Sequence, residues 1–375
     1  MNNITCGFIG LGLIGGSIAR ALKEKMSSVR IVAFDVNKDT LLLAQEEQIA
    51  DVITDKIDES FKECEYIFLC APVSYNSANL EAVKAVISPE CILTDVGSVK
   101  KGIHIAISNA GLNAQFIGGH PMAGSERIGF ANSKAVLLEN AYYILTPTKE
   151  VSSVQIEKFH NLVSGLGAIP LVLPFEKHDY VTAAISHLPH LIASSLVNLV
   201  HDSDSSDGIM KMIAAGGFKD ITRIASSSAV MWQQICLSNT ENISALLGNY
   251  ISSLEAIKKD LDSKNSEALY HFFDSARLYR DSFINASSGP IKSTFMLRLD
   301  IDDKTGALAS VVATLASESI NIKNIGITHN RESADGVVQI EFYDDESLEK
   351  ARKIFDKNTP KQPPQESSAT SKILP

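Results

Sequence analysis

Two different periodicities follow one another along the first 290 residues. From Ile4 to about Pro174, short apolar runs of strand length alternate with amphipathic segments of helical length, such as Ile14–Lys25 and Asn79–Ile87. The strand-like runs are Ile4–Ile9, Val29–Phe34, Tyr66–Cys70, Ile92–Val96, Gln115–Gly118, Tyr142–Leu145 and Ile169–Leu173. This alternation predicts a mostly parallel sheet with helices on both faces. We therefore expect an α/β dinucleotide-binding type of domain over residues 1–174.

The pattern becomes helical after Pro174. Apolar residues recur at helical spacing in two long segments. One segment contributes Leu188, Leu191, Ile192, Leu196, Leu199 and Val200, and the other contributes Leu246, Leu247, Tyr250, Leu254 and Ile257. The spacing predicts an all-α domain over residues 175–290, and Asn285–Pro290 has the composition of a linker.

Strands return in the C-terminal part of the chain. The pattern predicts, in this order, Thr294–Ile301 as a strand, Gly306–Leu315 as a helix, Asn321–Thr328 and Val337–Phe342 as strands, and Ser347–Phe355 as a helix. The order βαββα is most of a small α+β ferredoxin-like module, which we expect over residues 291–357. Residues 358–375 are rich in Pro, Ser, Gln and Lys, which is typical of a disordered tail.

Composition and charge narrow the class of protein. The chain has 375 residues, of which 45% are hydrophobic and 21% are charged, as in a globular protein of two or three domains. Its formal net charge of −10 argues against a nucleic-acid partner, which requires a basic surface. We find no leader-like N-terminus and no uninterrupted apolar run of membrane-spanning length, so we expect a cytoplasmic protein without a membrane partner. The five cysteines lack metal-site spacing, which predicts free thiols and no metal.

A glycine-rich turn joins the first predicted strand to the first predicted helix. Its sequence, Gly10-Leu11-Gly12-Leu13-Ile14-Gly15, has the GxGxxG pattern in the context of strand, turn and helix. In that pattern Gly10 permits the turn, Gly12 lets a pyrophosphate approach the backbone, and Gly15 lets helix and strand pack closely. The free amides at the helix N-terminus, including those of Leu13 and Ile14, favour the phosphates.

Asp35 ends the second predicted strand, 20 residues after Gly15. A carboxylate at this place accepts hydrogen bonds from the ribose hydroxyls of the cofactor and repels a 2′-phosphate, so the sequence predicts NAD rather than NADP. Pro72 is a further candidate for the cofactor site. The alternative is a glycine-rich turn that packs helix on sheet without binding a ligand.

Two later segments carry reactive side chains after predicted strands. Thr94–Lys100 carries Ser98, whose hydroxyl could lie near the cofactor or cap a helix. Gly118–Glu126 carries His120 in a predicted loop, where two glycines let the backbone come close to a ligand. A purely structural role of His120 is the alternative.

Two further segments lie in the helical domain. A long helix is expected over residues 178–201, with a kink at Pro189; His187 and His190 fall on nearby faces, and either could be structural. Gly216 and Gly217 precede a predicted helix start that could bind an anion. Arg223 could bind a carboxylate through bidentate hydrogen bonds, or it could form an ion pair with a Glu.

Together these segments resemble the prephenate dehydrogenase family. The resemblance is carried by Gly7–Ser17, Asp95–Lys100, Gly119–Glu126, Ser186–His190 and Gly217–Ala225. Their order and spacing fit the family from about residue 5 to residue 290. The C-terminal module resembles an ACT domain, with Asp303–Leu308 as its characteristic loop.

The resemblance implies NAD-dependent oxidative decarboxylation of prephenate to 4-hydroxyphenylpyruvate in the tyrosine pathway. His120 would take the proton of the C4 hydroxyl while hydride leaves, so activity is expected to rise with pH through about 6.5. Ser98 would orient His120 near the nicotinamide. Arg223 would bind a substrate carboxylate, and His190 would contact the substrate.

The resemblance also implies further contacts and partners. Ser125, Glu126, Lys219 and Gly217 would belong to the substrate site, with Glu126 and Lys219 in an ionic gate with Arg223. The helical domains would pair in a homodimer. Tyrosine would act as effector near Gly306, Asn321 and Asn324. One departure from the ACT pattern is that no fourth strand follows Phe355.

Three other readings of the sequence stay open. The substrate could be arogenate, the amino analogue of prephenate. The chain could also be another small-substrate reductase of the Rossmann-plus-helical class, although such enzymes use a catalytic Lys in place of the Gly-His-Pro segment. Finally, it could be a non-catalytic sensor of NAD and tyrosine, although a sensor does not need His120 as a proton acceptor.

Overall fold

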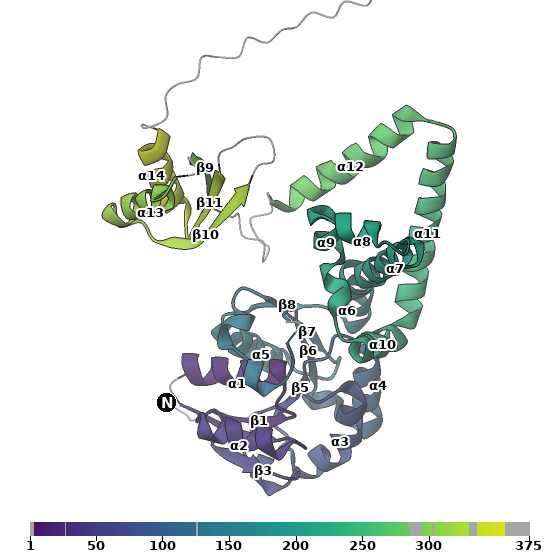
Figure 1. Ribbon diagram of the computed structural model, residues 1–375. Helices are drawn as coiled ribbons and strands as arrows, with labels where there is room; N and C mark the ends of the chain where they lie inside the picture. The colour runs from purple at the N-terminus through teal and green to yellow at the C-terminus, as the bar shows by residue number, and fades with distance from the viewer. Residues whose placement is uncertain are drawn as a thin grey trace, which may run out of the picture. The chain divides into compact units, whose positions relative to one another are not determined.

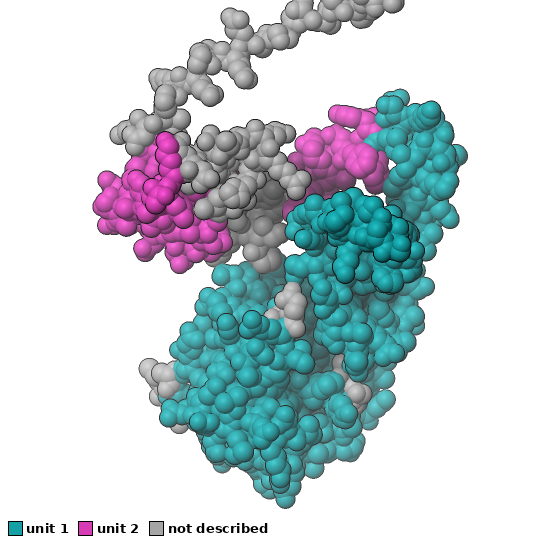
Figure 2. All heavy atoms as spheres, viewed as in Figure 1, with its two compact units in different colours: residues 1–269 teal, residues 270–375 magenta. Residues whose placement is uncertain are grey.

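The computed structural model describes residues 4–26, 28–124, 127–284, 295–301, 304–329 and 336–356. These residues form two compact units, residues 1–269 and 270–375 (Figure 2). The predicted linker Asn285–Pro290 and the predicted tail 358–375 lie outside the described residues.

A parallel sheet of five strands forms the first part of unit 1 (Figure 1). Its strands are β1 (Ile4–Ile9), β2 (Val29–Phe34), β3 (Val52–Thr54), β4 (Tyr66–Leu69) and β5 (Ile92–Asp95), in the order β3-β2-β1-β4-β5. Four of them were predicted. The edge strand β3 was missed, because three residues are too few to show an alternating pattern.

The sheet buries a separate hydrophobic core on each face, as the two-residue periodicity of a strand requires. Helices α1 (Leu13–Lys25), α2 (Lys38–Glu46) and α5 (Ser153–Gly165) contribute to one core, and α3 (Val73–Val86) and α4 (Lys101–Ala110) to the other. In β4, Phe68 belongs to the first core and Leu69 to the second. Helices on both faces confirm the predicted α/β layering.

A second sheet of three strands corrects one part of the prediction. Strand β6 (Ile117–Pro121) is antiparallel to β7 (Tyr142–Pro147), which is parallel to β8 (Ile169–Val172). The predicted strand Gln115–Gly118 therefore begins and ends later, and His120 lies in a strand rather than in a loop. Gly118 and Gly119 of β6 leave no room for a side chain. A Cβ on Gly119 would lie 2.5 Å from the carbonyl oxygen of Asp95, and one on Gly118 would lie 2.3 Å from Oγ1 of Thr146.

The helical part begins at Pro174. Its helices are α6 (Phe175–Thr182), α7 (Leu188–Ser203), α8 (Ile209–Ile213), α9 (Gly216–Thr222), α10 (Ala229–Ser238), α11 (Thr240–Asp262) and α12 (Ser266–Ile284). The predicted long helix is interrupted by a π-helical turn, Ala183–His187. The interruption precedes Pro189, which has no N–H to donate to the carbonyl four residues earlier. The division between the two units falls within α12.

Among the described residues, one helical run, Phe175–Ser203, is long and apolar enough to cross a membrane by length and composition alone. A single such helix is weak evidence for a membrane protein, since a core helix passes the same test. Within the most apolar stretch of this run, 17% of the residues are buried inside the chain. The run also carries three histidines of the candidate site described below.

The C-terminal part of unit 2 is a small antiparallel sheet with two helices. Its elements are β9 (Phe295–Ile301), α13 (Ala307–Ser317), β10 (Ile322–His329), β11 (Gly336–Phe342) and α14 (Asp345–Asp356). The strand order is β10-β11-β9. Val338 and Ile340 of β11 pack with Leu315 of α13 and Ala351 of α14, so both helices cover the same face. The predicted order βαββα is confirmed.

Shorter turns of 3₁₀ helix complete the described secondary structure. They are Glu59–Phe61, Asn113–Gln115, Phe130–Asn132, Ala135–Leu138 and Arg223–Ser226.

Candidate active site

The glycine-rich turn lies between the carboxyl end of β1 and the N-terminus of α1. Gly10 has a φ of +90°, and a Cβ there would lie 2.6 Å from the backbone nitrogen of Ala71. A Cβ on Gly15 would lie 2.9 Å from Cβ of Cys70, so α1 packs closely on the sheet. At Gly12, the N-cap of α1, a Cβ would meet no atom within 4 Å. The space above Gly12 and the free amides of the first helical turn can therefore take a phosphate group.

Asp35 follows β2 and holds this turn. One carboxylate oxygen accepts the amide of Leu11 at 2.7 Å, and the other accepts the amide of Asn37 at 2.8 Å. Each oxygen can accept one more hydrogen bond. The carboxylate is thus fixed beside the glycine turn, at the place where a ribose would lie in a bound dinucleotide.

A cleft of about 650 Å³ lies between the strand ends of the α/β part and α10. The strand-end side contributes Gly12, Cys70, Ala71, Pro72, Tyr75, Val96, Gly97, Ser98 and Val99, and the helical side contributes Ser228, Val230, Met231, Gln234, Ile235 and Ser238. The cleft therefore brings three predicted site residues, Gly12, Pro72 and Ser98, to one cavity.

A buried ion pair ties β5 to β6 behind the loop that lines this cleft. Lys100 is fully buried and pairs with Asp95, and it also donates to the carbonyl oxygen of Gly119 at 2.7 Å. The carboxylate of Asp95 accepts the amides of Gly97 at 2.9 Å and Gly119 at 3.1 Å. Burial lowers the pKa of Lys100, and the charge of Asp95 opposes this shift. Losing one partner of such a buried pair would leave an uncompensated charge and cost about 3–5 kcal/mol.

His120 is linked to two residues that the sequence analysis did not single out, His178 directly and Asp179 through His178. Its Nδ1 lies 2.8 Å from Nε2 of His178, and Nδ1 of His178 lies 2.7 Å from a carboxylate oxygen of Asp179. Both partners come from α6 and are buried. The same carboxylate accepts the amides of Lys100 and Lys101 at 2.8 Å each, and so caps α4.

The surroundings of His120 keep its ring neutral. Burial lowers the pKa of His120 well below 6.5, and the nearby His178, Lys100 and His187 lower it further. The expected acid limb at about 6.5 assumed an ordinary histidine pKa, and a lowered pKa of His120 would place that limb at a lower pH.

Two histidines near Pro189 have different surroundings. His187 is buried, with its Nδ1 3.2 Å from Nδ2 of Asn239, and burial lowers its pKa to about 4. His190 is half-buried and stacks on Trp232, with ring centroids 3.6 Å apart. Its Nδ1 donates to the carbonyl oxygen of Ser186 at 2.9 Å, which leaves Nε2 as the acceptor. Arg223 lies close enough for its charge to lower the pKa of His190.

Several predicted details of the site change in the structure. Ser98 does not cap a helix, since α4 begins at Lys101 and is capped by Asp179 instead. Within the described residues, Nδ1 of His120 is bonded to His178 and no hydrogen bond joins His120 to Ser98. Gly216 and Gly217 lie in the first turn of α9, whose last turn holds the exposed Lys219. The predicted Ser125 and Glu126 lie outside the described residues.

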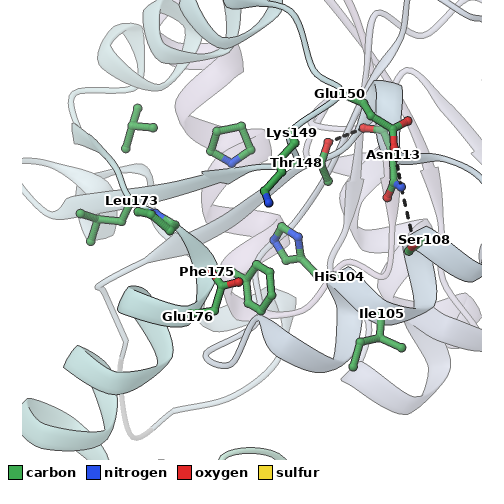
Figure 3. Close-up of a pocket in the computed structure, with 13 residues that line it drawn as sticks. His104, Ile105, Ser108, Asn113, Thr148, Lys149, Glu150, Leu173, Phe175 and Glu176 are labelled. Carbon is green, nitrogen blue, oxygen red and sulfur yellow. Dashed lines mark hydrogen bonds between the residues drawn. The ribbon is translucent and has the colours of Figure 1, made fainter.

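A second hollow, of about 620 Å³, contains none of the predicted site residues. Figure 3 shows the side chains of His104, Lys149 and Phe175 converging on it. The ring of His104 stacks on Phe175 with centroids 4.5 Å apart, and its Nε2 lies 2.9 Å from Oγ1 of Thr146. Burial lowers the pKa of His104 to about 4. The cleft beside Ser98, which holds three predicted site residues, is therefore the candidate active site, and His104 lies outside it.

No group of three or more His, Cys, Asp or Glu side chains is placed to hold a metal ion within the described part of the chain. A parallel sheet with a glycine turn at the end of β1, a carboxylate after β2 and a following helical domain that lines the cleft is the arrangement of nucleotide-dependent dehydrogenases.

Comparison with known proteins identifies the family of this chain. The chain matches the nucleotide-binding domain of prephenate dehydrogenase over residues 18–171 and the prephenate dehydrogenase dimerization domain over residues 174–275. It is 37% identical to a prephenate dehydrogenase of Bacillus subtilis, over 92% of this chain and 94% of the relative. It is 34% identical to one of Lactococcus lactis, over 94% of this chain and 97% of the relative. The chain belongs to the prephenate dehydrogenase family of NAD-dependent oxidoreductases.

Solved structures agree with this assignment. A prephenate dehydrogenase of Aquifex aeolicus, in complex with hydroxyphenyl propionate and NAD⁺, is 30% identical, with a TM-score of 0.71 over 76% of this chain and 99% of that chain. The arogenate dehydrogenase of Synechocystis is 27% identical, with a TM-score of 0.68 over 75% of this chain and 100% of that chain.

Proposed function

We propose that this protein oxidises prephenate with NAD to 4-hydroxyphenylpyruvate, releasing carbon dioxide, as a step of tyrosine biosynthesis. The proposal rests on membership of the family across both matched domains. The observation that carries it is the buried His120, whose strand is tied through Asp95 to the Gly97 loop that lines the cleft. A neutral imidazole at this position can accept a proton from a substrate hydroxyl.

His120 acts in this proposal as the general base. It takes the proton of the C4 hydroxyl while the carbon–hydrogen electron pair at C4 leaves as hydride. The carboxylate on the ring then leaves as carbon dioxide, and its bonding electrons complete the aromatic ring. His120 returns the proton to the phenolate oxygen that results, so no net proton is gained or lost.

Substrate binding falls to the helical part in this proposal. Arg223 holds a substrate carboxylate, and His190, stacked on Trp232, offers Nε2 to the substrate. Gly217, Lys219, Ser125 and Glu126 complete the substrate site. Ser98 lines the cleft. In this proposal its hydroxyl lies near the nicotinamide and orients His120 when substrate and cofactor are bound.

NAD fits the residues of the glycine turn. The open space at Gly12 and the amides of Leu13 and Ile14 would hold the pyrophosphate, with Gly10 and Gly15 shaping the turn. Asp35 would hold the ribose hydroxyls, and Pro72 would line the nicotinamide side of the cleft. When bound, NAD supplies the hydride acceptor.

The C-terminal module is proposed to be an ACT domain that binds tyrosine. Its element order and its strand order β10-β11-β9 support a ferredoxin-like arrangement. Gly306 has a φ of +91° at the N-terminus of α13, and the pairing of β10 with β11 is irregular between Ile322 and Asn324. A loop and an irregular strand of this kind would form the effector site, with Asn321.

The proposed domain limits are 1–174, 175–290 and 291–357, with residues 358–375 as a tail. Homodimerisation through the helical domain is supported by the matched dimerization domain and by exposed apolar side chains on α10 and α11. We place the enzyme in the cytoplasm.

The test is the formation of NADH from NAD with either prephenate or arogenate, each with and without tyrosine. We expect turnover of prephenate that tyrosine suppresses. Turnover of arogenate alone would change the substrate and keep the mechanism. NAD binding without turnover of either substrate would contradict the proposal and favour a sensor.

A further inference from the structure

His120 is one end of a buried chain of hydrogen bonds. The chain runs from Nδ1 of His120 to Nε2 of His178 over 2.8 Å, and from Nδ1 of His178 to a carboxylate oxygen of Asp179 over 2.7 Å. The exposed fractions of the three residues are 9%, 0% and 2%. In such dry surroundings each hydrogen bond is strong, and each nitrogen must have a defined role as donor or acceptor.

The carboxylate end of the chain sets the direction of every bond in it. Burial raises the pKa of Asp179, but the hydrogen bonds from His178 and from the amides of Lys100 and Lys101 outweigh it and lower that pKa overall. An ionised carboxylate can only accept, so Nδ1 of His178 carries a proton. When the ring of His178 holds that proton alone, its Nε2 is the acceptor. Nδ1 of His120 must then be the donor. The remaining nitrogen of His120, Nε2, keeps its lone pair.

Asp179 is itself held from three sides. Its two carboxylate oxygens accept the amides of Lys100 and Lys101 at the N-terminus of α4, where the helix dipole favours a negative charge. Its carbonyl oxygen accepts Nδ2 of Asn239 at 2.7 Å, from the junction of α10 and α11. One carboxylate therefore links the orientation of His120 to the helix that follows the cleft-lining loop 97–99.

We propose that His178 and Asp179 are positioning residues of this site, which fix His120 in the tautomer whose Nε2 accepts the substrate proton. The inference deepens the proposed function and rests on it, because it concerns the base of the same site. When Nε2 accepts the hydroxyl proton, the ring becomes an imidazolium whose Nδ1–H still donates to His178. The negative charge of Asp179, at the far end of the chain, stabilises that cation.

A purely structural role would make a different prediction. Asp179 would then only cap α4, and the histidine pair would only fill space between α6 and β6. In that case, replacing Asp179 by Asn would lower stability and leave turnover unchanged, because Asn also caps helices. The two roles are separated by asking whether the ring of His120 changes its tautomer.

The first experiment compares Asp179→Asn with the wild-type protein. The amide of Asn can donate to His178, which reverses the order of donors and acceptors along the chain. In serine proteases the corresponding change lowers kcat about 10⁴-fold by imposing the wrong tautomer. We expect kcat to fall by about 10²–10⁴-fold, with the KM for prephenate and the Kd for NAD changed by less than about threefold.

The matched control is His104→Gln. His104 is also a buried histidine of this unit, hydrogen-bonded to Thr146 and stacked on Phe175, but it lies outside the chain from His120 to Asp179. We expect its kcat to stay within about threefold of the wild-type value. A loss of kcat in His104→Gln as large as in Asp179→Asn would overturn the proposal.

A second readout needs no turnover and therefore separates this inference from the proposed function. Nitrogen-15 NMR of histidine-labelled protein reports which ring nitrogen carries the proton, and His120→Asn assigns the signal. We expect a protonated Nδ1 and a bare Nε2 for His120 in the wild-type protein, and the reverse or a mixture in Asp179→Asn.

If Asp179→Asn does not fold, His178→Gln tests the same chain. We expect a folded protein by circular dichroism and the same loss of kcat. An unchanged His120 tautomer together with a wild-type kcat, in whichever variant folds, would overturn the proposal and leave Asp179 as a helix cap.

Discussion

An imidazole with 9% of its surface exposed is harder to protonate than one in water, because burial disfavours the charged form. The groups packed around His120 add to this effect. His178 from α6, His187 from the π-helical turn and Lys100 next to α4 each lower its pKa. A histidine with a lowered pKa stays neutral until the pH has fallen well below the usual pKa of histidine.

The pH dependence of the reaction follows from this shift. We expect kcat/KM for prephenate to stay level from neutral pH down past 6.5 and to fall only as the pH approaches the lowered pKa of His120. Initial rates, measured over a pH series in buffers of constant ionic strength, give the pH at which kcat/KM falls to half. A midpoint at or above about 6.5 would contradict the account.

Arg223 is the second residue whose role can be tested alone. If its guanidinium binds a substrate carboxylate, Arg223→Ala should raise the KM for prephenate by roughly 10–150-fold, the equivalent of about 1.5–3 kcal/mol for a charged hydrogen bond. The Kd for NAD should stay unchanged. Lys211→Ala, which removes an exposed positive charge on α8, is the control. Equal KM values in the two variants would assign Arg223 a structural role.

At this scale, local motifs were predictable and distant pairings were not. The glycine turn with Asp35, and His120 within a Gly-His-Pro segment, stand out because each motif is continuous in the sequence. His178 and Asp179 carry no such motif, since their role depends on a contact 58 residues away. A His-Asp pair at the start of the helical domain was the available signal.

Among the elements, β6 contains glycines that made its strand pattern hard to recognise in the sequence. The sequence predicted a strand that ends at Gly118 and a loop after it, yet Gly119 also lies in the strand, and both glycines allow β6 to approach its neighbours closely. The same packing fixes the backbone of His120, whose neighbour Gly119 is bonded to both Asp95 and Lys100. The backbone position of His120 therefore depends on the lack of a side chain at Gly119.

Gly119→Ala tests this point. Its Cβ would lie 2.5 Å from the carbonyl oxygen of Asp95 and 2.9 Å from Oγ1 of Thr94, so we expect a loss of about 1–3 kcal/mol in the free energy of unfolding. Gly102→Ala in α4 is the matched control, since its Cβ would meet no atom within 4 Å and should stabilise the helix by up to about 1 kcal/mol. Urea unfolding measures both. Equal midpoints in the two variants would contradict the packing argument.

The sequence predicted a kink near Pro189 in one long helix. The structure has a π-helical turn, Ala183–His187, just before that proline. A proline inside an apolar helical pattern indicates a kink, because one backbone hydrogen bond is lost. Whether the chain kinks, breaks or widens into a π-helical turn depends on neighbouring contacts. Here the turn Ala183–His187 places His187 against Asn239 and Trp232, which the sequence pattern could not show.

At the scale of the whole molecule, several large apolar side chains of α10 and α11 are exposed within the described part of the chain. Leu237 is 73% exposed, and Ile251, Leu254 and Leu261 on α11 are about half exposed. Apolar surface of this extent on consecutive helices is typical of an interface between subunits. The domain order itself was predictable, because each part has its own periodicity.

The dimer proposed above can be broken at this surface. We expect sedimentation velocity to give twice the chain mass for the wild-type protein and a monomer or weakened dimer for Leu254→Asp, because a buried charge opposes association. Ser253→Asp adds the same charge at the neighbouring exposed position of α11 and is the control. A monomeric wild-type protein would contradict the dimer.

The central claim is that a neutral, buried His120 is the base for oxidation of prephenate. Its most direct test is NADH formation by His120→Asn at saturating NAD and prephenate, with the Kd for NAD measured in parallel. The account predicts a kcat about 10²–10⁴-fold below the wild-type value, with NAD binding unchanged. Near-normal turnover in His120→Asn would contradict it.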